Sequence, residues 1–326
     1  MQQPPPGLLS ARDLAEAAVQ AFLALVAATR PVDAWPGWCR RLAGLFPPSG
    51  GPARLAEFRE ALRAVLGDVP DAEAEAIFAS RWEGLYRRRM MVVRECVRPK
   101  GVRFTWQGWE HLEAARAAGD GAALWAGEFV FATLAGKRGL FEAGVPLHQI
   151  SSRHHGFRHS RFGNAVLNRL QVAMEDRYLA GRLSFEGRDS GMLIRRAMRL
   201  LRSGGFVVFT NNVFGGRSFI QLPLGPAGAV SMSTTPIALA LRQEVPLFFV
   251  TTIEKEPLAH YEIRVSEDLT AGERPVGEAG KREADDAAVA RIAAKARDEL
   301  LAGLRAAPDQ FLNWLPLARP KLPDRT

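Results

Sequence analysis

Side chains that could perform acid–base chemistry follow two apolar runs in the middle of the chain. The run Ala122 to Ala126 comes after a Gly-Asp-Gly turn, and Glu128 stands two residues beyond its end. A second run, Val145 to Ile150, is followed by a basic cluster: Arg153, His154 and His155. Both runs are typical of buried strands, and ligands of a parallel sheet bind outside the carboxyl ends of its strands. We therefore expect Glu128 and the basic cluster at the same rim of a sheet.

Glu128 has two interpretations. A carboxylate at the start of a helix is stabilised by the free backbone N–H groups there, and this needs no function. As a general base, Glu128 would need burial to raise its pKa, because a carboxylate at its reference pKa is a weak base for a hydroxyl. His154 or His155 could supply an imidazole that Glu128 orients. The spacing of these residues and His159 matches no strong zinc pattern, so we predict no metal.

Several polar side chains near the same segments suit an anionic substrate, because arginine binds phosphate and carboxylate through a planar fork. A solvated surface is the alternative. We assign substrate binding here to Arg153, Arg158, His159 and Arg217. The chain has no Walker spacing, no G-x-G-x-x-G after a strand and no G-x-S-x-G elbow. Nucleotide binding and a serine hydrolase are therefore unsupported, and we predict no cofactor.

The composition leaves several partners open. The 326 residues carry a net charge of +8, and the pI is near 10. A nucleic acid, an anionic membrane surface or an anionic substrate would each suit this charge, and GC-rich codon usage would also produce it. No motif of interleaved basic and aromatic residues supports nucleic-acid binding. We therefore predict an anionic membrane surface or an anionic substrate rather than a nucleic acid.

The cysteines and the N-terminus indicate the compartment. Cys39 and Cys96 form no metal pattern and no disulfide framework, which favours a reducing compartment. The N-terminal residues lack the basic region of a signal peptide, and the apolar run Ala17 to Ala28 is too short to span a bilayer. We expect a cytoplasmic protein, with a peripheral position on the inner membrane through the N-terminal helix and Arg87–Arg89 as an extension of this prediction.

The order of elements predicts an α/β fold. Helices are expected from Ser10 to Thr29 and over 38–45, 53–66 and 71–97, and strands begin near residue 102. We predict an N-terminal helical region over 1–100 and an α/β domain over 101–326. Its mixed, mainly parallel sheet is covered by helices on both faces. A further helix is expected from Ser231 to Arg242. The expected inner strands are Ala122–Ala126, Val145–Ile150, Phe206–Phe209 and Pro246–Ile253.

Three longer segments carry a resemblance to a known family. These are VRFTWQGWEHLEAARAAGDGAALWAGEF with the following SSRHHG, the stretch from MLIRRAMRLLRSGGFVVFTNN to IALALRQEVPLFFV, and the end PDQFLNWLPLARPK. In order and spacing they resemble the lipid A biosynthesis acyltransferases, the lauroyl and myristoyl transferases of bacterial outer-membrane lipid. The resemblance covers roughly residues 85–319. It places Arg153 at the position of that family's substrate-cleft arginine.

The resemblance breaks at the catalytic dyad. Where the family has His-x4-Asp or His-x4-Glu, this chain has Glu128 and Thr133. Where the family has an acidic cluster after a later strand, this chain has Asn211 and Asn212, so these two residues and Thr133 are further expected substrate contacts. The resemblance implies transfer of an acyl group from an acyl carrier protein or a coenzyme A thioester to a hydroxyl or amine. The acceptor is a lipid or a small molecule. The alternative is a non-catalytic scaffold that binds a lipid or an acyl carrier protein.

Overall fold

The N-terminal part of the chain is helical. The computed structural model describes residues 7–8, 10–151, 160–184, 190–210, 219–273 and 285–318. Ser10 begins the first helix, because its side chain accepts the N–H of Asp13 and the Asp13 carboxylate accepts the N–H of Ser10. The helices are α1 (Ala11–Thr29), α2 (Trp35–Leu45), α3 (Gly51–Leu66) and α4 (Asp71–Val97).

A seven-stranded mixed sheet follows, with the strands in the order β1-β9-β8-β2-β5-β3-β4. Strands β8, β2, β5, β3 and β4 are parallel to one another, whereas β9 runs antiparallel to β8 and β1 is parallel to β9. The bounds are β1 (Arg103–Gln107), β2 (Ala122–Ala126), β3 (Leu147–Ser151), β4 (Gly181–Ser184), β5 (Phe206–Thr210), β8 (Leu247–Glu256) and β9 (His260–Val265). The predicted mixed, mainly parallel α/β fold is confirmed, and the four expected inner strands are all interior to the sheet.

Alternating side chains of the inner strands enter different cores. Trp125 of β2 and Phe249 of β8 belong to one apolar cluster, whereas Leu124 and Phe248 belong to another. The first cluster includes buried residues of α8 (Ser190–Arg202), α9 (Thr235–Gln243) and α10 (Asp286–Ala306), and the second includes residues of α5 (Trp109–Ala117) and α6 (Lys137–Glu142). Burial on both faces explains why these strands are continuous apolar runs.

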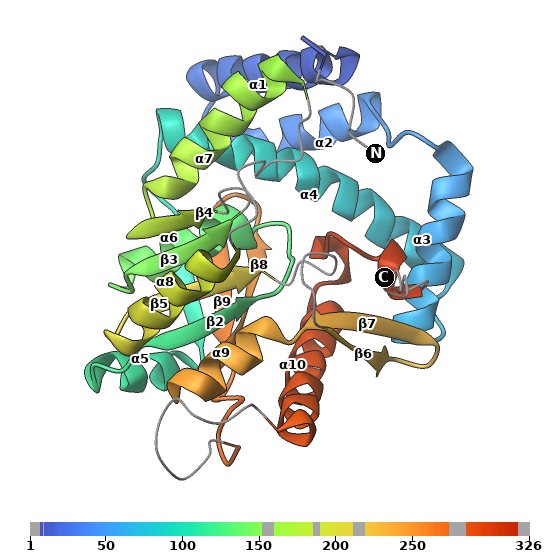
Figure 1. Cartoon of the computed structure of the whole chain (residues 1–326). Coiled ribbons are helices and arrows are strands. Elements are labelled where there is room, and N and C mark those ends of the chain that lie inside the picture. The colour runs from blue at the N-terminus through green and yellow to red at the C-terminus, as the bar shows by residue number, and fades with distance from the viewer. Residues whose placement is uncertain are drawn as a thin grey trace.

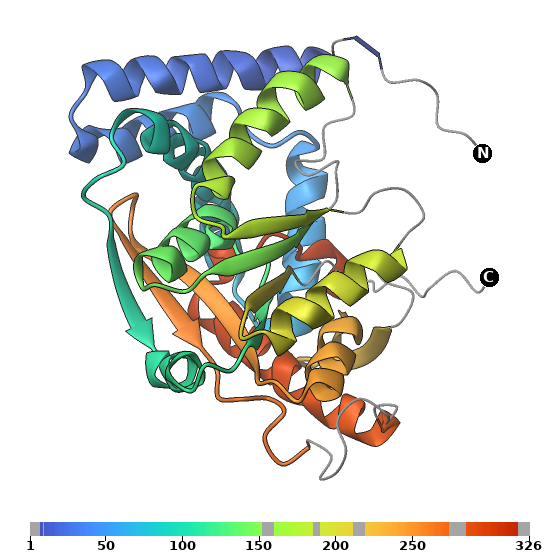
Figure 2. The same cartoon turned by 60° about the vertical axis from the view of Figure 1, so that its left-hand side comes forward.

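Helix α4 lies between helices α1 and α2 on one side and the sheet on the other. Figure 1 shows α4 running across one end of the strands beneath α1 and α2, and Figure 2 shows the same outer helices after a 60° turn. A third apolar cluster fills this layer, with Leu23 of α1, Trp35 of α2 and Met90 of α4 packed together with Tyr261 of β9. The layer therefore rests on the sheet through α4.

One predicted helix is partly a strand. Gly228–Ser233 is β7, which pairs antiparallel with β6 (Phe219–Leu224), and α9 begins only at Thr235. The expected helix from Ser231 was therefore wrong in its first turn, because the hairpin partner of this segment lies earlier in the chain. Gly225 occupies a left-handed conformation in the hairpin turn, where a side chain would meet the backbone of Val65.

The segments around β3 and β4 also differ from expectation. The helix between β2 and β3 starts not at Glu128 but later, with a π-helical turn at Ala132–Gly136 that continues into α6. A second π-helical turn, Gly163–Asn168, leads into α7 (Arg169–Asp176), and β4 adds an edge strand that the sequence pattern did not predict. The short helix α11 (Leu315–Ala318) ends the described chain. No helix in these described ranges is both long and apolar enough to cross a membrane.

Candidate functional site

Glu128 lies just past the carboxyl end of the central strand β2. The neighbouring strands on both sides, β5 and β8, are parallel to β2, and the N–H of Gly127 still donates to the carbonyl of Val250 in β8 at 2.9 Å. A Cβ at Gly127 would lie 3.1 Å from the ring of Phe129, so a larger residue here would require that ring to shift. Glu128 is thus at the rim where ligands of parallel sheets bind.

The C-terminal segment 310–313 holds Glu128 in place. Phe129 forms an antiparallel bridge with Phe311, and the carbonyl of Glu128 accepts the N–H of Leu312 at 3.0 Å. The side-chain amide of Asn313 donates to the Glu128 carboxylate. Glu128 is therefore outside strand β2 and four residues before the π-helical turn that begins at Ala132, so its interpretation as a helix-stabilising carboxylate is wrong.

The surroundings of Glu128 favour the protonated form more than water does. Burial raises its pKa from an ordinary 4.5 to about 7, because a carboxylate loses solvation inside protein. The hydrogen bond from Asn313 and the positive charge of Arg88 act in the opposite direction, but with smaller effect. A carboxyl group with a pKa near 7 exchanges its proton readily at neutral pH, which is what general acid–base catalysis requires.

Helix α4 fixes the opposite side of this segment. Arg81 donates to the carbonyls of Phe311 at 3.0 Å and Leu312 at 2.7 Å. The side chain of Gln310 forms two hydrogen bonds with the backbone of Glu254, at 2.7 and 2.9 Å. Residues 310–313 are thereby held by α4 and β8 while they position Glu128.

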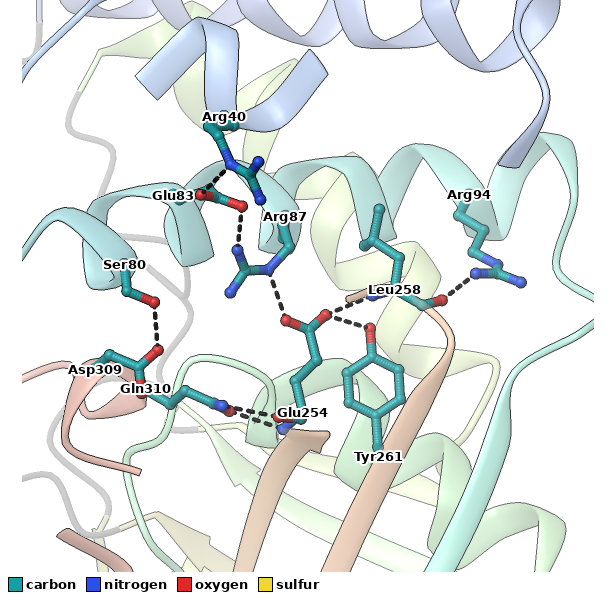
Figure 3. A network of polar contacts seen from close by, with 10 residues as sticks. All are labelled: Arg40, Ser80, Glu83, Arg87, Arg94, Glu254, Leu258, Tyr261, Asp309 and Gln310. Carbon is teal, nitrogen blue, oxygen red and sulfur yellow. Dashed lines mark hydrogen bonds and ion pairs between the residues drawn. The ribbon is translucent and has the colours of Figure 1, made fainter. Parts of the chain in front are cut away.

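The network in Figure 3 extends this support into the helical layer. Arg87 donates to Glu83 at 2.7 Å and to Glu254 at 2.6 Å, and both side chains of the Arg87–Glu254 pair are buried. Glu254 also accepts the N–H of Leu258 at 2.7 Å and the hydroxyl of Tyr261 at 3.2 Å. Burial opposes the charge of Arg87, but the two carboxylates outweigh burial and raise its pKa. This network ties α4 to the end of β8.

The same pairing corrects the expectation that Arg87–Arg89 contact a membrane. Arg87 is buried against Glu254, and Arg89 donates to Glu16 of α1 through Nε and Nη2, each at 2.9 Å. Arg88 is only partly exposed and faces Glu128, Glu175 and Glu16 electrostatically. Arg87 and Arg89 thus hold other elements of the molecule against α4, whereas no such contact is found for Arg88 among the described residues.

A second group of charges is connected with Glu128 through Arg88. Glu175 of α7 is buried and accepts hydrogen bonds from Lys137 of α6 and from Arg182 of β4, the latter at 3.4 Å. Burial lowers the pKa of Lys137, and Glu175 opposes that effect. Arg88 is close enough to act on the charges of both Glu128 and Lys137. Helices α6 and α7 therefore place charged side chains near Arg88, which in turn acts on Glu128.

Most of the site residues expected from the sequence lie outside the described residues. These are Arg153, His154, His155, Arg158, His159, Asn211, Asn212 and Arg217. The five residues between 153 and 159 were placed near Glu128 because β2 and β3 were expected to end at the same rim. The strand register tests that expectation. Ala126 pairs with Thr210, and Gln149 pairs with Val208, so Ser151 ends β3 at the level where β2 ends. The described strands β3 and β5 thus end, at Ser151 and Thr210, at the same rim as β2 and Glu128.

Thr133 lies in the π-helical turn before α6 and is partly buried. No contact joins its side chain to Glu128 in the described part of the structure, so its predicted role in substrate binding stays a prediction. Among the described residues, no group of three or more His, Cys, Asp and Glu side chains could hold a metal ion.

Two residues near Glu128 were not anticipated. Asn313 lies 185 positions away, and no local pattern connects it with Glu128. Arg88 stands between two arginines that have structural partners. Only the direction in which it projects from α4 distinguishes it from them. The helical period was the one available signal, since Arg81 and Arg88 are spaced by seven and share a face of α4.

No protein-family model matches the chain, and a search of curated proteins likewise finds no match.

Proposed function

We propose that this protein is an acyltransferase-like enzyme in which Glu128 is the general base. The supporting observation is the position of Glu128: a largely buried carboxyl group, held by Asn313, at the carboxyl end of the central parallel strand. The resemblance of the surrounding sequence to lipid A acyltransferases supplies the reaction class. The donor is an acyl carrier protein or coenzyme A thioester, and the acceptor is a hydroxyl or amine of a lipid or small molecule.

The proposed reaction uses one carboxyl group for two proton transfers. The Glu128 carboxylate removes the proton from the acceptor O–H or N–H while the acceptor atom bonds to the thioester carbonyl carbon. The tetrahedral intermediate then breaks its C–S bond, and protonated Glu128 returns the proton to the departing sulfur. The ester or amide and a free thiol are the products. A pKa near 7 suits both transfers at neutral pH.

The base has a different chemical identity from that of the resembled family, and its partner differs as well. In the resembled family a histidine is the base and an acid orients it, whereas here the side chain that contacts the carboxyl group is the neutral amide of Asn313. An amide that donates to the carboxylate fixes its orientation and moderates its pKa without adding a charge. The replacement of a His–acid pair by Glu128 and Asn313 is therefore chemically consistent with base catalysis.

The test is release of thiol from acyl-coenzyme A and acyl carrier protein thioesters in the presence of a panel of hydroxyl and amine acceptors. Glu128→Gln keeps the size of the side chain and should reduce turnover at least about tenfold, because general-base catalysis contributes about 10²–10⁴-fold. The matched control is Glu110→Gln, which removes an exposed carboxylate of α5 and should leave turnover unchanged. Full turnover in Glu128→Gln would refute the role of Glu128. Saturable binding of acyl carrier protein without turnover would favour the scaffold alternative.

A further inference from the structure

Helix α4 carries five arginines, and all but one have direct partners. Arg81 donates to two backbone carbonyls of the C-terminal segment, and Arg94 donates to the carbonyls of Leu258 and Lys100. Arg87 and Arg89 form ion pairs with Glu254 and Glu16. Each of these four side chains therefore holds another element against α4.

Arg88 makes no hydrogen bond and no ion pair in the described part of the structure. Among the arginines described, Arg59 and Arg94 each have a buried side-chain nitrogen without a hydrogen-bond partner, but Arg88 has none. Its partly exposed side chain thus keeps some of its polar atoms accessible. Burial still dominates its electrostatics and lowers its pKa, with the negative charge of Glu175 as the largest opposing effect.

The carboxylates that face Arg88 are engaged elsewhere. Glu175 on α7 accepts from Lys137 and Arg182, Glu16 on α1 pairs with Arg89, and Glu128 accepts from Asn313. These groups create a negative environment that keeps Arg88 charged, but none of them lies within ion-pair distance of its guanidinium. The five N–H donors of its planar fork thus have no acceptor among the residues that the structure describes.

An arginine in this state lowers the stability of the fold. Desolvating a charge without a hydrogen-bonded partner is unfavourable, whereas a bidentate anion would satisfy the fork and recover that energy. The other four arginines of α4 show that neighbouring elements supply acceptors where an arginine has a structural role. The lack of an acceptor at Arg88 is what a ligand-binding residue needs before its ligand arrives.

We propose that Arg88 binds an oxyanion of the ligand, a phosphate or carboxylate group, at the rim next to Glu128. The ligand thus carries an anionic group at the side of the molecule where the charges of Arg88 and Glu128 act on each other. That this ligand is a substrate rests on the proposed function. The binding of an anion by Arg88 does not depend on that function. The sequence analysis assigned Arg88 only to a membrane contact, together with Arg87 and Arg89, and the resemblance assigned it no role.

Sulfate and acetate are suitable probes, because neither changes its charge between pH 6 and 8. Binding is measured by calorimetric titration at constant ionic strength, since the protein is strongly basic and screening would otherwise vary during the titration. Arg88→Gln is compared with Arg202→Gln, which removes the same charge from an exposed position on α8. We expect sulfate affinity to fall at least about tenfold in Arg88→Gln and to be unchanged in Arg202→Gln, because a hydrogen bond to a charged group contributes about 1.5–3 kcal/mol.

The two probes separate the sources of the anion. Binding of sulfate alone indicates a phosphate-type group, and binding of both probes also admits a carboxylate. Equal affinity in Arg88→Gln and the wild-type protein, equal losses in the two variants, or binding of neither probe would overturn the proposal.

A measurement of thermal stability distinguishes a ligand-binding role of Arg88 from a purely structural one. Without anion, Arg88→Met should have the same Tm as the wild-type protein or a higher one, whereas Arg87→Met should have a lower Tm because it leaves Glu254 unpaired. A lower Tm or failure to fold in Arg88→Met would also overturn the proposal. Glu128→Gln removes a neighbouring negative charge, so it should bind sulfate at least as well as the wild-type protein even if turnover is lost. The proposal and the proposed function can therefore fail separately.

Discussion

The raised pKa of Glu128 predicts a specific dependence of stability on pH. The folded protein holds the Glu128 proton up to about pH 7, whereas the unfolded chain releases it near 4.5. Between these values the folded state binds more protons, so the free energy of unfolding contributed by this group decreases as the pH rises. It is fully present below about 4.5 and is lost as the pH passes through about 7.

The structure gives the size of this effect. A rise in pKa from 4.5 to about 7, at about 1.4 kcal/mol for each pKa unit, corresponds to about 3 kcal/mol. Glu128→Gln stays neutral at every pH, and its side-chain oxygen can still accept from Asn313. The variant should therefore match the wild-type protein near pH 5 and be more stable by up to about 3 kcal/mol at pH 8.

Urea denaturation at pH 5, 6, 7 and 8 measures this difference directly. Other titrating groups change both proteins equally, so only the difference between the two free energies of unfolding is interpreted. Glu110→Gln is the control for the loss of an exposed carboxylate and should show no such trend. A difference between wild type and Glu128→Gln that is constant with pH would show that Glu128 titrates normally, and the reasoning would fail.

Three further outcomes are expected. Arg87→Met should lower the free energy of unfolding by about 3–5 kcal/mol in urea denaturation, because it leaves the buried Glu254 without its charge partner; a loss below about 1 kcal/mol would contradict this. Asn313→Leu removes the hydrogen bond that favours ionised Glu128, so the pH at which the stability contribution is lost should move upward, and an unchanged pH would count against the contact. Leu25 of α1 is 60% exposed, and Leu25→Glu should reduce flotation with anionic liposomes because it removes apolar surface from the expected membrane contact. Equal flotation of the wild-type protein with neutral and anionic liposomes would reject an electrostatic contribution.

Local patterns predicted the elements that local physics determines. The inner strands were found because burial on both faces requires uninterrupted apolar runs, as in Ala122–Ala126. The first helix was found because Ser10 and Asp13 form a capping box within four residues. The hairpin strand Gly228–Ser233 was read partly as helix, since its conformation depends on pairing with β6 and not on its own sequence.

The candidate site was predicted only in part for the same reason. Glu128 could be found because it directly follows a strand whose end defines a rim. Its orientation could not be found, since Asn313 approaches from the end of the chain. Arg88 was hidden among consecutive arginines, and only the tertiary partners of Arg87 and Arg89 distinguish the side chain that has none in the described structure.

The most direct test of the central claim is the pH dependence of kcat/KM for thioester consumption. If Glu128 is the general base with a pKa of about 7, kcat/KM should rise about tenfold per pH unit below pH 7 and level off above it. The same profile in Glu128→Gln should be low and should lack this inflection. Turnover that is independent of pH between 5.5 and 8, or an inflection that survives in Glu128→Gln, would contradict the assignment of Glu128 as the base.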